Sequence, residues 1–334
     1  MHSFFRSTLR TIIYAVLVMA MAGLSAEAQK FSIVYNFDVT HGQTPQAGLV
    51  RDSSGNLYGT TASGGSASSG VVFKINAKGK ITVLHTFNIN DGSFPRSDLT
   101  LNNNALYGTT LSGGTTGAGT VFRISTSGSG FKTLYSFTGQ NDGSNPGSGV
   151  IQDSQGNLYG TTEDGGMFLS GTLFRLSKSR KLTVLHSFTN INNDGAYPLG
   201  TLLQDASGNL YGTTSGGGGP NNFGTVFKIG SKGKFTQLHS FDGGIPDGEG
   251  PQGDLARDSS GNLYGTTTYG GNSSNSGTVF KITANGKERV LHSFSASDGK
   301  GPQGGLLLDP NGALYGLTVS GGSSDAGVVF KVTP

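Results

Sequence analysis

Short apolar runs alternate with glycine-rich polar stretches along most of the chain. Four such runs follow one another at residues 200–205 (GTLLQD), 209–214 (NLYGTT), 224–229 (GTVFKI) and 235–241 (FTQLHSF). Runs of this length that are rich in Val, Ile, Thr and Phe and are bounded by glycine predict β-strands. Residues 206–208 and 230–233 supply the glycines for two hairpin turns. The pattern predicts a unit of four antiparallel strands, here called a to d in chain order.

This unit recurs along the chain. The Leu-Tyr-Gly of strand b returns at intervals of 49 to 53 residues, with its leucine at Leu57, Leu106, Leu158, Leu210, Leu263 and Leu314. A fixed period of this length is the signature of repeat architectures, and four strands per repeat match the blades of a propeller. We therefore expect an all-β fold, a six-bladed β-propeller with four antiparallel strands in each blade.

The two ends of the repeat region complement each other. The sixth copy stops after its strand c at residues 327–332 (GVVFKV), and residues 31–37 (FSIVYNF) form a lone d-type run before the first copy. Pairing these two segments completes the sixth blade, which predicts a ring closed by the N-terminal strand. A linear solenoid does not require complementary partial repeats.

A glycine follows the tyrosine of strand b in every copy, at Gly59, Gly108, Gly160, Gly212, Gly265 and Gly316. Glycine inside a strand costs about 0.5–1 kcal/mol relative to alanine. We expect a close approach of another backbone near the crowded axis to require it.

The first 28 residues have the composition of a secretory signal peptide. Arg6 and Arg10 precede the apolar residues 11–24, and Ala26-Glu27-Ala28 forms a small-x-small cleavage pattern. The apolar stretch is shorter than the roughly 20 residues of a membrane span, although an uncleaved anchor is the alternative. We expect residues 1–28 to be removed and residues 29–334 to form the propeller, without a membrane span after cleavage.

Composition narrows the classes of partner. The net charge is +3 and falls to +2 without the predicted signal, and no Lys/Arg block suggests a nucleic-acid or anionic-membrane partner. Cysteine is absent, so we expect burial and strand pairing alone to stabilise the fold in a bacterial periplasmic or extracellular setting. Tryptophan is absent too, which disfavours a sugar site built on aromatic stacking.

The repeats resemble those of the Gloeo-Verruco (GloVer) repeat family of large secreted bacterial proteins. The shared pattern is DG-x-x-P, then L-x-x-D-x-x-G-N-L-Y-G-T-T, then G-G and G-T-V-F-K, and it covers residues 31–334 six times. The resemblance implies a secreted repeat protein but no particular activity. Some relatives carry C-terminal sorting segments, whereas this chain ends at Pro334 directly after strand c, from which we expect a product that is not anchored.

Two sets of residues recur in the loops and in strand d. The loop before strand a carries Asp-Gly, with the aspartates Asp91, Asp142, Asp194, Asp247 and Asp298. Because these loops lack the ligand density of an EF-hand, we expect turn capping rather than calcium binding. Strand d carries the histidines His85, His186, His239 and His292. Each lies in a different blade, so we expect that they do not share a metal ion.

Function is better sought where one copy departs from the others. The residue directly before the leucine or valine of strand a is, in the six copies in order, Gly, Asp, Gly, Thr, Asp and Gly. The two aspartates, Asp98 and Asp254, belong to the second and fifth copies, which are opposite blades of a six-bladed ring. Because strand a lines the channel, both are predicted to face the axis. The third copy has Glu163 and Asp164 after its Thr-Thr. Its next loop carries three apolar residues, Met167, Phe168 and Leu169, which mark a contact surface unless they reflect neutral drift.

Two functions remain open. The first is a non-catalytic, secreted scaffold that binds an extracellular ligand, glycan or protein through its loop-rich face, using the seven residues just named. The alternative is a metal-dependent hydrolase or lyase, similar to lactonase and strictosidine-synthase-type propellers. In it Asp98 and Asp254 hold a divalent metal and Glu163 acts as a third ligand or general base. The chain has no G-x-S-x-G, H-E-x-x-H or phosphate-binding glycine loop. We therefore favour the scaffold, without a cofactor.

Overall fold

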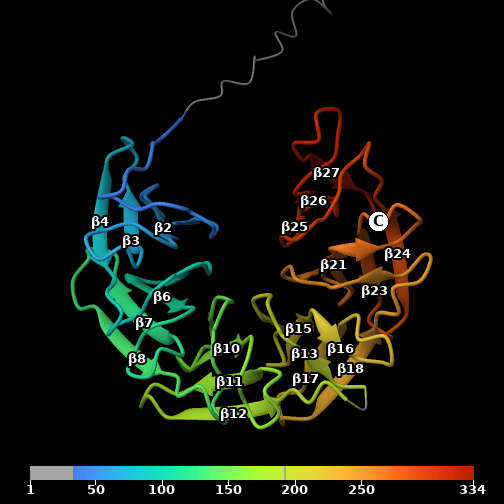
Figure 1. Ribbon diagram of the computed structural model, residues 1–334, viewed down its shortest axis with the longest axis horizontal. Coiled ribbons are helices and arrows are strands. Elements are labelled where there is room, and N and C mark those ends of the chain that lie inside the picture. Colours follow the sequence, from blue (N-terminus) through green and yellow to red (C-terminus); the bar gives the residue numbers. More distant parts are fainter. Residues whose placement is uncertain (1–32, 192) are drawn as a thin grey trace, which may run out of the picture. The chain divides into compact units, whose positions relative to one another are not determined.

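The repeated runs form the strands of six antiparallel sheets. The computed structural model describes residues 33–191 and 193–334. Within them, five sheets have four strands in the order a-b-c-d, and the last has three. We number these sheets 1 to 6 in chain order; they follow one another around a common axis (Figure 1). The described part of the chain is all-β and contains no helix.

The strands have the following bounds. Sheets 1 and 2 consist of β1 (Val50–Arg51), β2 (Leu57–Thr61), β3 (Val71–Ile75), β4 (Ile81–Thr86), β5 (Thr100–Asn102), β6 (Ala105–Thr110), β7 (Thr120–Ser125) and β8 (Lys132–Ser136). Sheets 3 and 4 consist of β9 (Ile151–Gln152), β10 (Leu158–Thr162), β11 (Thr172–Leu176), β12 (Leu182–Ser187), β14 (Leu203–Gln204), β15 (Leu210–Thr214), β17 (Thr225–Ile229) and β18 (Phe235–Ser240). Sheets 5 and 6 consist of β20 (Ala256–Arg257), β21 (Leu263–Thr267), β23 (Thr278–Ile282), β24 (Glu288–Ser293), β25 (Leu307–Leu308), β26 (Leu314–Leu317) and β27 (Val329–Val332).

Two short ladders were not expected from the sequence. The strand β13 (Gly195–Ala196) pairs with β16 (Gly216–Gly217), and β19 (Gly248–Glu249) pairs with β22 (Tyr269–Gly270). Each ladder joins the loop before strand a to the loop after strand b of the same repeat. Both loops therefore lie at the same end of the sheets.

An aspartate closes the hairpin between strands a and b. Asp205 accepts hydrogen bonds from the backbone N–H of Ser207 and Asn209, from Asn209 Nδ2 and from the Tyr211 hydroxyl, at 2.8–3.0 Å. Strand a is shorter than predicted: β14 spans Leu203–Gln204, and Asp205 belongs to this turn. The same contacts recur at Asp52. They lower the pKa of Asp52 to about 2, and the hydrogen bond from Asn56 Nδ2 has the largest effect. The motif D-x-x-G-N-L-Y thus encodes this turn.

The glycine of strand b lies under a phenylalanine ring. A Cβ atom on Gly212 would lie 2.6 Å from Phe227 Cζ and 3.1 Å from Leu202 Cδ2. Both neighbours are buried side chains, so the expected close approach of another backbone is wrong. The other five copies have the same arrangement of strand-b glycine, strand-c phenylalanine and a strand-a apolar residue. The glycine is required because the ring fills the space of its missing side chain.

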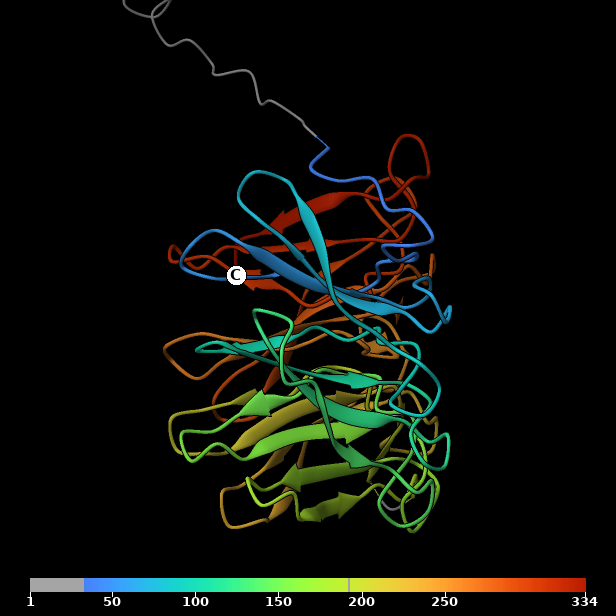
Figure 2. The same ribbon diagram turned by 90° about the vertical axis from the view of Figure 1, so that its left-hand side faces the viewer.

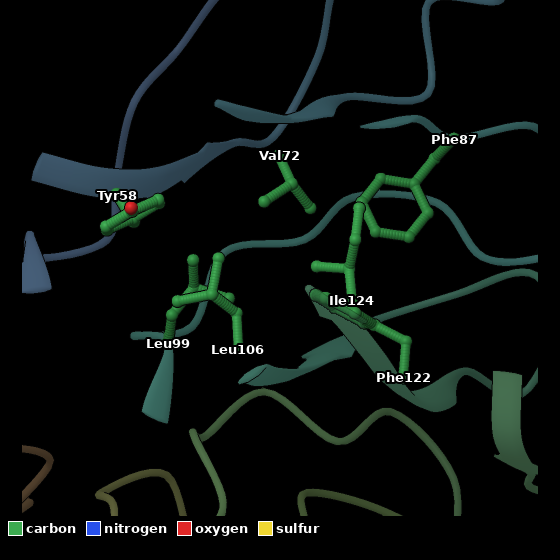
Figure 3. Close-up of a cluster of buried hydrophobic side chains, with 7 residues drawn as sticks. All are labelled: Tyr58, Val72, Phe87, Leu99, Leu106, Phe122 and Ile124. Atoms are coloured by element: carbon green, nitrogen blue, oxygen red, sulfur yellow. The ribbon is translucent and has the colours of Figure 1, made fainter. Parts of the chain in front are cut away.

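Consecutive sheets pack face to face through apolar side chains. Between sheets 1 and 2, Tyr58, Val72 and Phe87 meet Leu106 and Phe122 in a buried cluster (Figure 3). Equivalent clusters join each of the following pairs of sheets up to sheets 5 and 6. A phenylalanine after strand d meets the strand-c phenylalanine of the next sheet edge to face, as Phe87 meets Phe122 at 5.1 Å. Each buried ring contributes on the order of 1.5–3 kcal/mol.

The first strand of each sheet is the innermost. Strand β1 lies beside β5, β5 beside β9, and β20 beside β25, whereas the fourth strands lie at the periphery (Figure 1). The turned view shows the strands running between two sides that carry the connecting loops (Figure 2). In the described part of the chain, no helix is long and apolar enough to span a membrane.

The N-terminal predictions are only partly covered. The predicted signal peptide, residues 1–28, and the first residues of the predicted closing strand lie outside the described residues. Phe37–Pro334 form one unit, and the described residues of the preceding unit, 33–36, contain no regular strand. Closure of the ring therefore stays a prediction.

The packing of ring on glycine predicts a sharp contrast between two alanine substitutions. In Gly160→Ala the new Cβ lies 2.8 Å from Phe174 Cζ, so the ring must move, and we expect a loss of about 1–3 kcal/mol in the free energy of unfolding. In Gly304→Ala the new Cβ has no heavy atom within 4 Å, and we expect no loss. Urea denaturation of both variants measures the difference, and equal stabilities would contradict the packing argument.

Candidate functional site

Six equivalent positions line one cavity at the axis. They are the residues two positions before the start of strand a, namely Gly48, Asp98, Gly149, Thr201, Asp254 and Gly305. The cavity has a volume of about 540 Å³. Its wall also includes the residue after the proline of each loop, namely Gln46, Arg96, Gly147, Leu199, Gln252 and Gln303. Residues from all six repeats thus meet in a single cavity, and Asp98 and Asp254 are among them.

Threonines of strand b hold the cavity wall together. The hydroxyl of Thr109 donates to the carbonyl of Ser148 at 2.8 Å, and that of Thr213 donates to the carbonyl of Gly253 at 3.3 Å. Each bond joins one sheet to the residue that precedes the axial position in the next sheet. These threonines are buried. The first threonine of Gly-Thr-Thr therefore fixes the distance between neighbouring repeats at the axis.

Asp98 and Asp254 make equivalent contacts on two sides of the cavity. Gly48 N donates to Asp98 Oδ1 at 2.5 Å, and Thr201 N donates to Asp254 Oδ1 at 2.6 Å. In both cases the carboxylate reaches back to the axial position of the preceding sheet. A Cβ on Gly48 would lie 3.0 Å from Asp98 Oδ2, so glycine at that position leaves room for the carboxylate. Each aspartate is thereby oriented by a backbone N–H.

The two aspartates interact electrostatically. Burial raises the pKa of Asp254 to about 6, the hydrogen bond from Thr201 N opposes this, and the negative charge of Asp98 raises the pKa further. The two carboxyl groups favour a cation or a hydrogen-bond donor. A carboxyl group with a pKa near neutrality in a cavity is a feature of functional sites.

Arg96 is the residue of this site that the sequence analysis missed. Its Nη2 lies 2.9 Å from Glu163 Oε2, so the side chain that was expected to be a third metal ligand or a general base is bound in an ion pair. Both side chains are about one third exposed. The sequence distinguishes Arg96, because it is the one charged residue among the six that follow a loop proline. The pair links the cavity wall to the loop of the third repeat.

The other predicted residues of the third repeat lie outside the cavity wall. Asp164 Oδ2 accepts a hydrogen bond from Asn145 Nδ2 at 2.9 Å, which fixes the neighbouring loop. Met167, Phe168 and Leu169 are exposed, and Leu169 has a φ of 59°. The structure thus brings Asp98 and Asp254 together and leaves the apolar loop as a separate surface.

Each strand-d histidine contacts the aspartate of the loop that follows its strand. His85 lies 3.1 Å from Asp91, and His186 lies 3.0 Å from Asp194. The aspartates also accept backbone N–H groups, as Asp91 does from Asn88 at 2.9 Å. These contacts are those of turn capping, the role expected for the repeated Asp-Gly.

A second hollow involves only two repeats. It has a volume of about 700 Å³ and lies between the strand a–b hairpins of sheets 2 and 3, at the end opposite the loop pairs described above. Its wall includes Asn103, Arg123 and Lys178. Because it gathers no interacting acidic pair, we take the axial cavity as the candidate site.

Solved structures with the same fold are numerous, but their sequences are distant. The chain is similar to XC5397, a gluconolactonase from Xanthomonas campestris, at 15% identity and a TM-score of 0.50, over 89% of this chain and 88% of that chain. It is similar to a luciferin-regenerating enzyme at 14% identity and a TM-score of 0.51, over 88% and 92%. The extracellular domain assigned to a hybrid two-component system of B. thetaiotaomicron has 15% identity and a TM-score of 0.54, over 84% of this chain and 33% of that chain. Such similarities show the fold alone, which is all-β and propeller-like.

The repeat itself identifies the family. No curated protein sequence matches the chain significantly. The pattern of the Gloeobacter/Verrucomicrobia repeat matches residues 22–219 and 182–334, so that the two matches together cover most of the sequence. This confirms the resemblance seen in the repeated motifs, and the chain belongs to the Gloeobacter/Verrucomicrobia repeat family.

Proposed function

We propose that this protein is a secreted, non-catalytic binding module whose ligand occupies the axial cavity. The observation that carries the proposal is the convergence of six repeats on one cavity that contains the interacting carboxyl groups of Asp98 and Asp254. Its volume of about 540 Å³ lies within the range of small-molecule sites. The composition of residues 1–28, which is that of a signal peptide, supports export to the bacterial periplasm or the outside of the cell.

The chemistry of the wall favours a small ligand that donates hydrogen bonds. The carboxylates accept hydrogen bonds, and the glutamine amides beside them donate and accept. No aromatic residue lines the cavity among the described residues, so stacking contributes nothing to binding. A hydroxyl-bearing ligand such as a saccharide unit fits this wall, and an amine would pair with the same carboxylates. The exposed apolar loop of Met167, Phe168 and Leu169 is then a separate contact surface for a protein partner.

The proposed scaffold is a closed ring of six blades. Phe37 meets Phe73 edge to face at 5.0 Å, as Phe87 meets Phe122 and Phe294 meets Phe330. In those other pairs the first ring follows strand d of the preceding sheet. Phe37 thus takes the place of a residue that ends a strand d before sheet 1. This supports the assignment of residues 31–37 to the fourth strand of sheet 6, whose three described strands lack it.

A metal-dependent hydrolase or lyase is the second candidate. The raised pKa of Asp254 and the charge of Asp98 favour it, because carboxylate oxygens are ligands that a divalent cation prefers. The similarity in fold to a gluconolactonase is consistent with this activity. Glu163 is paired with Arg96, so this candidate has two acidic ligands rather than three.

The binding proposal predicts opposite effects of one substitution on stability and on binding. The native carboxyl of Asp254 keeps its proton up to about pH 6, whereas an unfolded aspartate loses it near pH 4, so stability falls as the pH rises between these values. Asp254→Asn removes this cost and retains an acceptor for Thr201 N. We expect the variant to be about 2–3 kcal/mol more stable than the parent at pH 7 and equal to it at pH 4.

The same variant should lose the ligand. A screen of saccharides and amines by calorimetry identifies a binder, and Asp98→Asn and Asp254→Asn should weaken its binding at least tenfold. Asp164→Asn is the matched control, because Asp164 lies outside the cavity wall, and it should bind as the parent does. Saturable binding that both cavity variants retain would move the site elsewhere.

Ring closure predicts a large effect of a short N-terminal deletion. Removal of residues 29–37 takes away the proposed outer strand of sheet 6 and the Phe37 ring, at about 1.5–3 kcal/mol for each large apolar side chain. We expect insoluble or strongly destabilised protein, since an open strand edge also promotes aggregation. Phe168→Ala, which removes an exposed ring, should leave the melting temperature unchanged. A soluble deletion variant with the melting temperature of the parent would contradict closure.

The enzyme candidate predicts a metal effect that depends on the cavity. Ca²⁺ or Mg²⁺ should raise the melting temperature, with about 2.7 kcal/mol of stabilisation at 100 times Kd, and Asp98→Asn should abolish that increase. A metal effect that persists in Asp98→Asn would place the ion outside the cavity.

A further inference from the structure

One inter-sheet contact at the periphery differs from its equivalents. In each of sheets 1 to 5 a histidine or tyrosine of strand d contacts the aspartate of the loop that follows this strand. The five pairs are His85–Asp91, Tyr135–Asp142, His186–Asp194, His239–Asp247 and His292–Asp298. The contact is therefore part of the repeat. A further role of one copy depends on the other residues that surround its pair.

An apolar side chain of the next sheet covers the pair in the earlier repeats. The ring of Phe131 stacks on His85 at 3.5 Å, and that of Phe235 stacks on His186 at 4.2 Å. Leu182 packs in the cluster that contains Tyr135. In sheet 5 the residue equivalent to Phe131, Leu182 and Phe235 is Glu288, the first residue of β24. A carboxylate thus faces His239 and Asp247 where the sister repeats place an apolar group.

The three side chains form a set of ligand atoms. One ring nitrogen of His239 and one carboxylate oxygen each of Asp247 and Glu288 lie within 4.8 Å of one another. Glu288 Oε1 is buried and accepts no hydrogen bond within the described part of the chain. A buried carboxylate oxygen without a donor is costly, and a bound cation removes that cost.

The set is partly preorganised. Asp247 Oδ2 accepts from Asp242 N and Oδ1 accepts from Gly248 N, both at 2.8 Å, so the orientation of this carboxylate is fixed by the backbone. The histidine and the aspartate are largely buried, with side-chain exposures of 20% and 15%. Burial raises the pKa of Glu288, the proximity of His239 opposes this, and the charges of Asp247 and Asp242 raise it further. The negative charges around the glutamate favour a positive ion.

We propose that His239, Asp247 and Glu288 bind a divalent transition-metal ion of the zinc class that joins sheets 4 and 5. One imidazole and two carboxylates form a mixed nitrogen and oxygen ligand set, which suits Zn²⁺ better than the all-oxygen preference of Ca²⁺ or Mg²⁺. Zinc bonds of about 2.0–2.2 Å bring the three ligand atoms closer together than they are here, and rotation of the Glu288 side chain supplies this movement. The site is peripheral and independent of the axial cavity.

Calorimetry of purified, untagged protein with Zn²⁺ tests the proposal. The parent should bind one equivalent, and Glu288→Gln and His239→Asn should each weaken binding at least 100-fold. His186→Asn is the matched control, because His186 has the same aspartate contact but is covered by Phe235 instead of a carboxylate. It should bind Zn²⁺ as the parent does, and Ca²⁺ should not replace Zn²⁺ at this site.

A second variant separates metal binding from folding. Glu288→Phe restores the apolar residue of the sister repeats, so it should fold and unfold cooperatively in EDTA, and its melting temperature should not respond to Zn²⁺. The parent's melting temperature should rise with Zn²⁺ and return to its starting value with EDTA. Any of three results would overturn the proposal: a parent that binds no Zn²⁺, a Glu288→Gln protein that binds as tightly as the parent, or an equal loss of binding in His186→Asn.

Discussion

The packing of one phenylalanine ring over one glycine is the contact on which the rest of the structure depends. Within each sheet the strand-c ring occupies the space above the strand-b glycine, as Phe227 does above Gly212. The edge of a second ring, from the end of strand d in the preceding sheet, contacts it, as Phe188 contacts Phe227 at 5.3 Å. The pair sets how closely two sheets approach, and its repetition keeps that distance nearly constant around the axis. A close-packed interior of this kind tolerates little change in volume.

Because the spacing between sheets is constant, the residues at one position of the repeat together line a cavity. Because the repeats are equivalent, the residue two positions before strand a lies at the same depth in each of them, and six such residues line the axis. Threonine hydroxyls join neighbouring copies at this level. Most copies place glycine or threonine there, so an aspartate in two of them adds negative charge without a change in the backbone. Chemistry in this protein therefore arises from departures of single residues from a common frame.

The same reasoning applies at the periphery, where Glu288 takes the position that an apolar residue has in the other repeats. Both departures place carboxylates where burial disfavours their charge, as the raised pKa values of Asp254 and Glu288 indicate. Groups that reduce the stability of the folded chain in this way mark functional sites in many proteins. The repeated aspartates of the turns behave in the opposite manner. Hydrogen bonds from neighbouring backbone and side-chain groups lower the pKa of Asp52 and stabilise its charge.

The sequence by itself determined the family, the four-stranded antiparallel unit and the equivalent positions of Asp98 and Asp254 in two repeats, because these follow from a period and from the alternation of apolar and turn residues along the chain. It also indicated the turn role of the repeated Asp-Gly. Only the tertiary structure decided that a phenylalanine ring covers the strand-b glycine, that Arg96 holds Glu163, and that Glu288 joins His239 and Asp247. These contacts join residues of different strands or different repeats. Their geometry depends on the distance between packed strands and sheets, which no local pattern in the sequence encodes.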